Sequence, residues 1–349
     1  MSAARRAAAG AVAIAAGVAG AVLAGRGSVR RHRTRPDPEV GEAFGTLPEE
    51  DLGPIRSFDG TDLAVRAAGP RDAPTIVFSH GFTLDMSTWH YQWRELSDRY
   101  RCVLFDQRGH GRSGNPPGGD FSLDAVGRDL RAVLDQTVGN GPVVLVGHSL
   151  GGMGILSFAD RYPAEFGERV RGVVLADTAA SDVLLGLLGT LGASLERRLR
   201  PLTDRVLFDP HRAERIQQAM DRWGRDLAFL IGRTTNFGPD ASAAQVEYVT
   251  RISAGARVEV WTQMLRSLME LDLRRALEAI TVPALVIVGD RDAVTPKTSA
   301  VAMREALPDG RGYVITRAGH VAMLEQHRVF NDLLDGFLEE VLVPQQAAG

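Results

Sequence analysis

The chain has 349 residues, of which 44% are hydrophobic and 24% are charged, and its formal net charge is −3. This composition is typical of a globular protein with one large domain or two small ones. Residues 1–36 contain seven arginines and no acidic residue, so the rest of the chain is acidic, which argues against nucleic acid as a partner. Cys102 is the only cysteine, which excludes an intrachain disulfide.

Residues 7–25 are uncharged and follow a pair of arginines. As a helix this stretch would be about 28 Å long, close to the ~30 Å hydrocarbon core of a bilayer. We therefore expect the N-terminal segment, 1–26, to associate with a membrane as a single-pass anchor, with the membrane side left open. Ala19–Ala21 also fits a signal-cleavage site, so a secreted or cell-envelope protein is the alternative, and a disordered tail is a third interpretation. Residues 27–52, rich in Arg, Pro and Glu, are predicted to be a linker.

From residue 53 onward, short apolar runs alternate with amphipathic segments. Apolar runs without polar alternation are typical of strands buried on both faces. Their alternation with helices predicts an α/β fold, a mostly parallel sheet with helices on both faces, preceded by an antiparallel hairpin over 55–67. The runs are Thr75–Ser79, Cys102–Asp106, Val143–Gly147, Val170–Asp177, Ala284–Gly289 and Gly312–Thr316, and the amphipathic segments lie near 86–99, 122–137, 150–162, 297–306 and 326–342.

One long interval interrupts this alternation. Residues 178–282 separate two predicted strands and contain Leu-rich helical stretches. A crossover between parallel strands needs only about 10–12 residues. We therefore predict an inserted helical cap over 178–282, which divides the folded core into a first part, 53–177, and a second part, 283–343.

The motif Gly147-His148-Ser149-Leu150-Gly151 lies between a predicted strand and a predicted helix. This context is that of a nucleophile elbow, in which glycines permit a turn too tight for side chains. Ser149 is therefore the candidate nucleophile, exposed at the edge of the sheet where ligands bind in open α/β folds. The backbone N–H of Leu150 is one candidate oxyanion donor, and that of Phe82, in the turn after an earlier strand, is the second.

With these motifs the chain resembles the α/β-hydrolase family, as a serine hydrolase with a helical cap. Similar members include esterases, monoacylglycerol-lipase-like enzymes and cofactor-free haloperoxidase-like enzymes. In the shared motifs, His110 and His148 are expected to be structural. The matching pieces cover most of 75–340 in family order: SHGF (79–82), DQRGHGRS (106–113), GHSLGG (147–152), GDRDAVTP (289–296) and AGH (318–320).

A serine nucleophile needs a general base, and the base needs an orienting acid. In this fold both follow the serine, the acid first. Of the two histidines that come late enough, His320 follows an apolar run in a Gly-containing loop, and His327 lies within a predicted helix, so we select His320. The candidate acids after strands are Asp177, Asp290 and Asp292. The resemblance places the acid at Asp292, whereas Asp290 would satisfy loop amides.

The resemblance implies acyl transfer to water by Ser149, His320 and Asp292. We expect a carboxylic ester hydrolase whose substrate is apolar, such as a monoacylglycerol or other short lipid ester, because the cap and the N-terminal segment are rich in apolar residues. The alternatives are a perhydrolase or haloperoxidase-like enzyme, an acyltransferase, and a ligand receptor with slow turnover. The sequence contains no H-E-x-x-H, no paired Cys/His spacing and no P-loop, so we expect no metal or cofactor. It does not predict the oligomeric state.

Overall fold

A mixed β-sheet forms the centre of the protein, whose computed structural model describes residues 27, 29–181, 228–257 and 259–342. Its strands within those residues are β1 (Glu50–Arg56), β2 (Asp62–Ala68), β3 (Thr75–Ser79), β4 (Arg101–Phe105), β5 (Val143–His148), β6 (Val170–Ala176), β7 (Ala284–Gly289) and β8 (Gly310–Ile315). Their order is β1-β2-β4-β3-β5-β6-β7-β8. β2 is antiparallel to both its neighbours, and all other neighbours pair in parallel. The predicted hairpin and strands are therefore confirmed, with small shifts at their ends.

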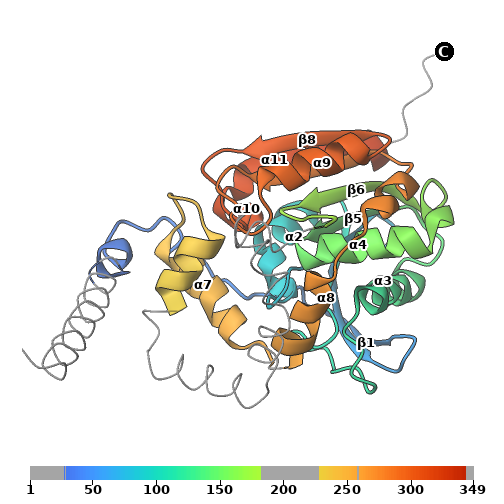
Figure 1. The fold of residues 1–349 in the computed structure, drawn as a ribbon, viewed down its shortest axis with the longest axis horizontal. Helices are drawn as coiled ribbons and strands as arrows, with labels where there is room; N and C mark the ends of the chain where they lie inside the picture. Colours follow the sequence, from blue (N-terminus) through green and yellow to red (C-terminus); the bar gives the residue numbers. More distant parts are fainter. Residues whose placement is uncertain (1–26, 28, 182–227, 258, 343–349) are drawn as a thin grey trace, which may run out of the picture.

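Helices pack on both faces of the sheet (Figure 1). A 3₁₀ turn, η1, and helices α2, α10 and α11 lie on one face, and α3, α4 and α9 lie on the other. A short 3₁₀ turn, η2, connects α4 to β6. The predicted fold class is confirmed by this arrangement. The bounds are η1 Met86–Trp89, α2 His90–Leu96, α3 Leu123–Thr137, α4 Leu150–Arg161, η2 Pro163–Glu165, α9 Lys297–Ala306, α10 Ala322–Glu325 and α11 His327–Leu342.

The central strands are buried on both faces, which explains their continuous apolar sequences. In β3, Ile76 and Phe78 belong to the core under α2 and α11, while Val77 belongs to the core under α3 and α4. Every residue of β3, β4 and β5 is buried. Cys102, in β4, is a buried free thiol, and burial raises its pKa to about 12. This cysteine is therefore part of the core.

The described residues between β6 and β7 are mostly helical, as expected for the predicted cap. Its described elements begin with a helix over 228–236. Residues 182–227 of the predicted cap lie outside the described residues, so the boundaries 178–282 stay a prediction. The further elements are α7 (Ala243–Ala254), a π-helical turn η3 (Val260–Met264), α8 (Leu265–Met269) and a 3₁₀ turn η4 (Arg274–Ala279).

The N-terminal part of the described chain lies beside α7 in Figure 1. The Asp37 carboxylate accepts a hydrogen bond from the N–H of Ala244, in the first turn of α7, at 2.8 Å. Glu42 Oε1 lies 2.8 Å from Nε2 of the buried His90 of α2. The segment that we predicted as a linker, 27–52, thus makes specific contacts with both the cap and the core.

The prediction of a membrane anchor over residues 7–25 was wrong. Among the residues that the structure describes, no helix is both long enough and apolar enough to cross a bilayer. The expectation gave too much weight to length, because most positions of this stretch are Ala or Gly, which carry little apolar surface. Residues 7–25 and the alternative signal-cleavage site lie outside the described residues.

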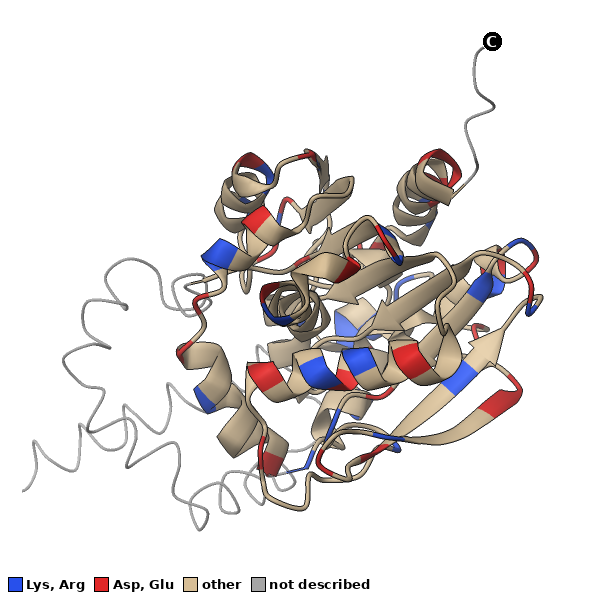
Figure 2. Cartoon of the chain, turned by 90° about the vertical axis from the view of Figure 1, so that its right-hand side faces the viewer, with Lys and Arg blue, Asp and Glu red and all other residues tan. Residues whose placement is uncertain are grey.

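Charges of both signs are interspersed along the helices that face the viewer in Figure 2. In this view of the described chain, basic residues do not gather into a continuous stripe of the kind that tracks a phosphate backbone. The exclusion of nucleic acid as a partner stays a prediction from the acidic charge of the chain.

Replacing Glu42 by Ala is expected to destabilise the folded protein by about 1–3 kcal/mol, because the buried His90 Nε2 loses its carboxylate partner and is left with only the Arg94 guanidinium, at 3.3 Å. Burial is the first cause that lowers the pKa of His90, so this ring stays neutral near pH 7 and depends on the hydrogen bond. Urea unfolding measures the free-energy change. Glu49→Ala is the matched control on the same segment, since the Glu49 side chain is exposed. Equal stability of the two variants would show that the segment does not hold α2.

Candidate active site

The turn between β5 and α4 presents Ser149 at the carboxyl edge of the sheet. Ser149 has φ 51° and ψ −115°, a strained conformation for a residue with a side chain. A Cβ on Gly147 would lie 2.6 Å from the carbonyl carbon of Gly151, and a Cβ on Gly151 would lie 2.1 Å from the Ser79 oxygen. Both glycines are thus required by close backbone approaches, as the elbow motif predicts.

Ser149, His320 and Asp292 lie within hydrogen-bonding distance of one another in series. Ser149 Oγ is 3.1 Å from His320 Nε2, and His320 Nδ1 is 2.9 Å from Asp292 Oδ2. The three residues are 7%, 7% and 6% exposed, respectively. Because Nδ1 of His320 faces a carboxylate, it carries the ring proton, which leaves Nε2 free to accept the serine proton.

The Asp292 carboxylate is held by its own loop. Oδ1 accepts the N–H groups of Val294 and Thr295, at 2.7 and 2.9 Å, and Oδ2 accepts the Thr295 hydroxyl at 2.7 Å. Burial alone would raise the pKa of Asp292, but His320 and these hydrogen bonds hold it below the ordinary value. Burial alone would likewise lower the pKa of His320, but Asp292 raises it above 6.5. The pair therefore favours an ionised acid beside a basic imidazole.

The other two candidate acids face backbone amides instead. Asp290 accepts the N–H of Arg317 at 2.6 Å. Asp177 accepts the N–H of Gly289 at 2.8 Å and that of Ala322 at 3.1 Å. Burial and then the nearby Asp292 charge raise the pKa of Asp177 to about 8. Among the hydrogen bonds of the described residues, neither carboxylate meets the His320 ring, so both serve the loops around it.

The remaining candidate histidines make structural contacts. His327 begins α11 and stacks on the Tyr91 ring with centroids 3.8 Å apart. His110 Nδ1 donates to a backbone carbonyl at 2.9 Å. His148 Nε2 donates to the backbone oxygen of His320 at 2.7 Å. Burial lowers the pKa values of His110 and His148 to about 3, so both rings are neutral.

The two predicted oxyanion donors lie at adjoining turns. Leu150 is the first residue of α4, and Phe82 follows β3, against which α4 begins through the Gly151–Ser79 approach. Neither N–H donates to another group of the described chain. Both amides are therefore available to a ligand oxygen beside Ser149, an arrangement that suits a developing oxyanion.

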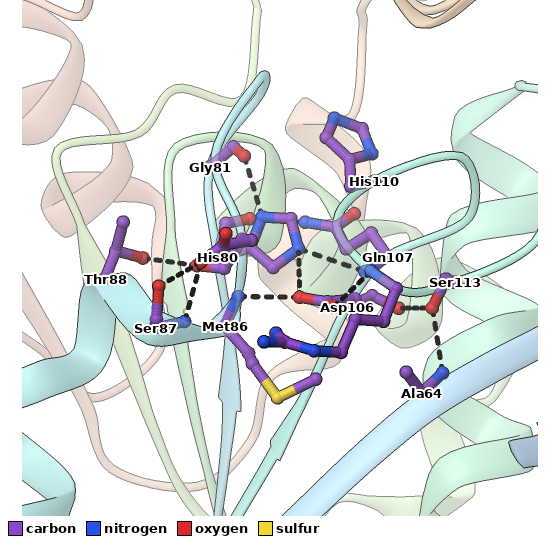
Figure 3. Close-up of polar contacts among 12 residues, drawn as sticks. Ala64, His80, Gly81, Met86, Ser87, Thr88, Asp106, Gln107, His110 and Ser113 are labelled. Atoms are coloured by element: carbon purple, nitrogen blue, oxygen red, sulfur yellow. Dashed lines mark hydrogen bonds and ion pairs between the residues drawn. The ribbon is translucent and has the colours of Figure 1, made fainter. Parts of the chain in front are cut away.

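His80 holds the carbonyl of the peptide that carries the Phe82 amide, and Figure 3 shows its contact with the Gly81 oxygen. His80 Nδ1 donates to the Gly81 oxygen at 2.8 Å, and Nε2 accepts the N–H of Gln107 at 3.0 Å. Burial lowers the pKa of His80, although Asp106 opposes this, so the ring is neutral, and its two hydrogen bonds set one tautomer. In a trans peptide the N–H points opposite to the carbonyl, so a Gly81 oxygen held by His80 directs the Phe82 N–H away from the ring.

Apolar side chains from the cap cover this turn. Val260 and Met264 of η3 pack with Leu150 in one buried cluster, and Phe82 packs against it. The exposed Trp261 ring meets the Phe82 ring edge-on, with centroids 5.2 Å apart. A π-helical turn is rare and often marks a functional position. The cap thus brings apolar and aromatic surface to the residue that carries one oxyanion amide.

The sequence profile of the alpha/beta hydrolase fold family matches residues 74–326, and the chain belongs to this family. The chain is 27% identical to 3-oxoadipate enol-lactonase 2 of Acinetobacter baylyi, over 82% of this chain and 98% of the relative. It is 27% identical to a bifunctional esterase/perhydrolase of Acinetobacter calcoaceticus, over 70% of this chain and 84% of the relative. The solved esterase of Thermogutta terrifontis superposes with TM-score 0.64 at 24% identity, covering 84% of this chain and 99% of that one. The protein is thus an α/β hydrolase with esterase and lactonase relatives.

Several residues around the site were not predicted from the sequence. The sequence predicted only a turn at His80. The histidine directly before the turn glycine was the one feature that could have indicated its contact with the Gly81 carbonyl. The amide contacts of Asp177, and those of Glu325 described below, join loops that are far apart in the chain, so no local pattern indicates them. Among the described residues, no group of His, Cys, Asp and Glu side chains could hold a metal ion.

Replacing Asp292 by Asn is expected to lower kcat about 10⁴-fold, because the amide no longer holds the required His320 tautomer. The hydrolysis of p-nitrophenyl acetate measures the loss. Asp290→Asn is the matched control two residues away and should keep most of the activity, since an amide oxygen can still accept the Arg317 N–H. A large loss in Asp290→Asn with little loss in Asp292→Asn would reverse the two roles.

Replacing His80 by Phe is expected to lower kcat by up to about 10²-fold with little change in KM, because the Gly81–Phe82 peptide loses the shorter of its two bonds and keeps only the one from the Leu84 N–H, at 3.2 Å. Phe82→Leu is the comparison, since it keeps the backbone amide and should cost less than about tenfold. Steady-state kinetics with p-nitrophenyl acetate separate kcat from KM. A greater loss of kcat in Phe82→Leu would mean that the ring, not the amide, serves the reaction.

Proposed function

We propose that the protein hydrolyses carboxylic esters through an acyl-enzyme on Ser149. The observation that carries the proposal is the series of contacts from Ser149 Oγ to His320 Nε2 and from His320 Nδ1 to Asp292. A serine hydroxyl next to an oriented imidazole and two free amides is the geometry of acyl transfer.

In the first half-reaction, Ser149 Oγ attacks the ester carbonyl carbon while His320 Nε2 takes the hydroxyl proton. The amides of Leu150 and Phe82 stabilise the oxyanion, a contribution of about 3–4 kcal/mol for each such donor. His320 then gives the proton to the leaving alcohol. In the second half-reaction His320 takes a proton from water, the hydroxide attacks the acyl carbon, and His320 returns a proton to Ser149 Oγ as the acid leaves.

The substrate class is proposed to be an ester with an apolar acyl or alcohol group. Support comes from the apolar surface that η3 and α8 bring to Leu150 and Phe82, with Trp261 at its exposed margin. The lactonase relative acts on a cyclic ester by its name, so linear and cyclic esters both belong in the substrate series.

A perhydrolase activity is the second candidate, because the relative from Acinetobacter calcoaceticus is named as both esterase and perhydrolase. The same acyl-enzyme serves both reactions, since hydrogen peroxide can replace water as the acceptor. An acyltransferase would use the same acyl-enzyme but transfer the acyl group to an alcohol instead of water. A ligand receptor with slow turnover is the remaining alternative.

A fluorophosphonate probe is expected to label the purified protein at Ser149 and to fail with Ser149→Ala, since the probe reacts only with an activated serine. The same substitution should lower kcat roughly 10⁶-fold, because the residual rate comes from binding and the oxyanion amides alone. Mass spectrometry of the labelled peptide and hydrolysis of p-nitrophenyl esters from acetate to laurate give the two measurements.

The Ser113→Ala protein is a control for the loss of a buried serine hydroxyl, because Ser113 donates to the Asp106 carbonyl and not to a histidine. It should be labelled like the wild type. A wild-type protein that stays unlabelled and binds the esters without cleaving them would support the receptor alternative and exclude the proposed hydrolase. Adding hydrogen peroxide or an alcohol to the acyl-enzyme and identifying the acyl product distinguishes the perhydrolase and acyltransferase alternatives from hydrolysis.

A further inference from the structure

The cap and the loop that carries His320 meet backbone to backbone. We define the cap segment as residues 236–238 and the His320 loop as residues 317–320. The N–H of His320 donates to the Asn236 oxygen at 2.8 Å. A Cβ on Gly319 would lie 2.6 Å from that same oxygen, closer than any side chain permits. The cap segment is therefore fitted directly against the backbone of the candidate general base.

One carboxylate joins the two parts. Glu325, the last residue of α10, accepts the N–H of Gly238 in the cap segment with Oε2 and the N–H of Gly319 in the His320 loop with Oε1, both at 2.6 Å. Two charge-assisted bonds from a single side chain hold two backbone segments that are far apart in sequence. A carboxamide has only one acceptor oxygen, so Gln cannot make both bonds.

Charged groups from each neighbouring element face this joint. Arg233, in the helix over 228–236, attracts the Glu325 carboxylate and also donates to the Phe237 oxygen at 3.2 Å. Asp292, on the loop after β7, repels it. Arg317 pairs with Asp240 on the exposed side. Burial raises the pKa of Glu325 to about 7, so the side chain is a carboxylate at pH 8 and above.

We propose that Glu325 is a positioning residue that fastens the cap segment to the His320 loop, so that the cap and the imidazole are held in place by the same side chain. The inference rests on the proposed function, in which His320 is the general base. The Glu325 charge also acts on the base itself: burial lowers the pKa of His320, and the carboxylates of Asp292, Asp177 and Glu325 raise it.

The test compares the wild type with Glu325→Gln at pH 8 by hydrogen–deuterium exchange without substrate. Exchange at Gly238 and at Gly319–His320 is expected to rise together by about tenfold or more, because both segments lose a bond to a charged acceptor. Exchange in β3 and β5 should not change, which shows that the core is folded. Asp332→Asn removes an exposed carboxylate of α11 and should leave all these amides unchanged.

Two kinetic readouts separate positioning from a purely structural role. With p-nitrophenyl acetate, Glu325→Gln should lower kcat about tenfold or more, because His320 loses its placement. The acid limb of kcat/KM should also move to lower pH, because a carboxylate that raises the pKa of His320 is gone. A loss of stability alone would lower activity without moving this limb.

The proposal is overturned if exchange rises only in the cap segment, or if kcat falls without a rise in exchange. If Glu325→Gln does not fold, the wild type still provides a test. After correction for intrinsic rates, the Gly238 and Gly319 amides should exchange within about twofold of each other, since one side chain holds both, and unequal rates reject the proposal. Because exchange is measured without turnover, it stays informative even if Ser149 is not labelled.

Discussion

The close approach of α4 to the central strands is the constraint on which the site depends. No side chain fits at Gly147 or Gly151, where the start of the helix lies against β5 and β3. The chain reverses within one residue, and that residue, Ser149, takes a positive φ. This conformation places the Ser149 hydroxyl outside the sheet. The close approach of α4 to β3 also brings the amide of Leu150 beside the turn that carries Phe82. Nucleophile and oxyanion donors thus follow from one packing requirement.

The sequence could predict the sheet because its parallel strands are covered on both faces, so that each is a continuous apolar run. It could also predict the elbow, whose glycines are adjacent in the chain. Contacts between segments that are distant in the chain leave no comparable local pattern in the sequence. The bond from Asp37 to α7 and the bonds of Glu325 to two loops depend on where the fold places each backbone amide. The N-terminal anchor was predicted from a long uncharged stretch, whereas no helix of the described chain is long and apolar enough to cross a bilayer.

The buried histidines show how environment separates structural roles from a basic role. His80, His110 and His148 each have lowered pKa values, because burial disfavours the charged ring and their partners are mostly backbone groups. His320 is equally enclosed, yet its pKa is raised, because the Asp292 carboxylate meets Nδ1. A buried acid within hydrogen-bonding distance of the ring therefore distinguishes His320 from the three neutral rings, since Asp106 lies 3.9 Å from His80 Nε2 and does not offset its burial. The amides and hydroxyl around Asp292 in turn keep that acid ionised.

The contacts of the N-terminal segment bear on how the chain acquires its structure. Glu39 lies 3.7 Å from Nε2 of His327, which begins the C-terminal helix, and its other oxygen accepts the Tyr91 hydroxyl. The first and last parts of the described chain therefore meet. During synthesis the segment has no complete docking surface until α11 has left the ribosome. Contacts of such sequence separation slow folding. The segment is thus expected to be among the last parts of the protein to reach its final position.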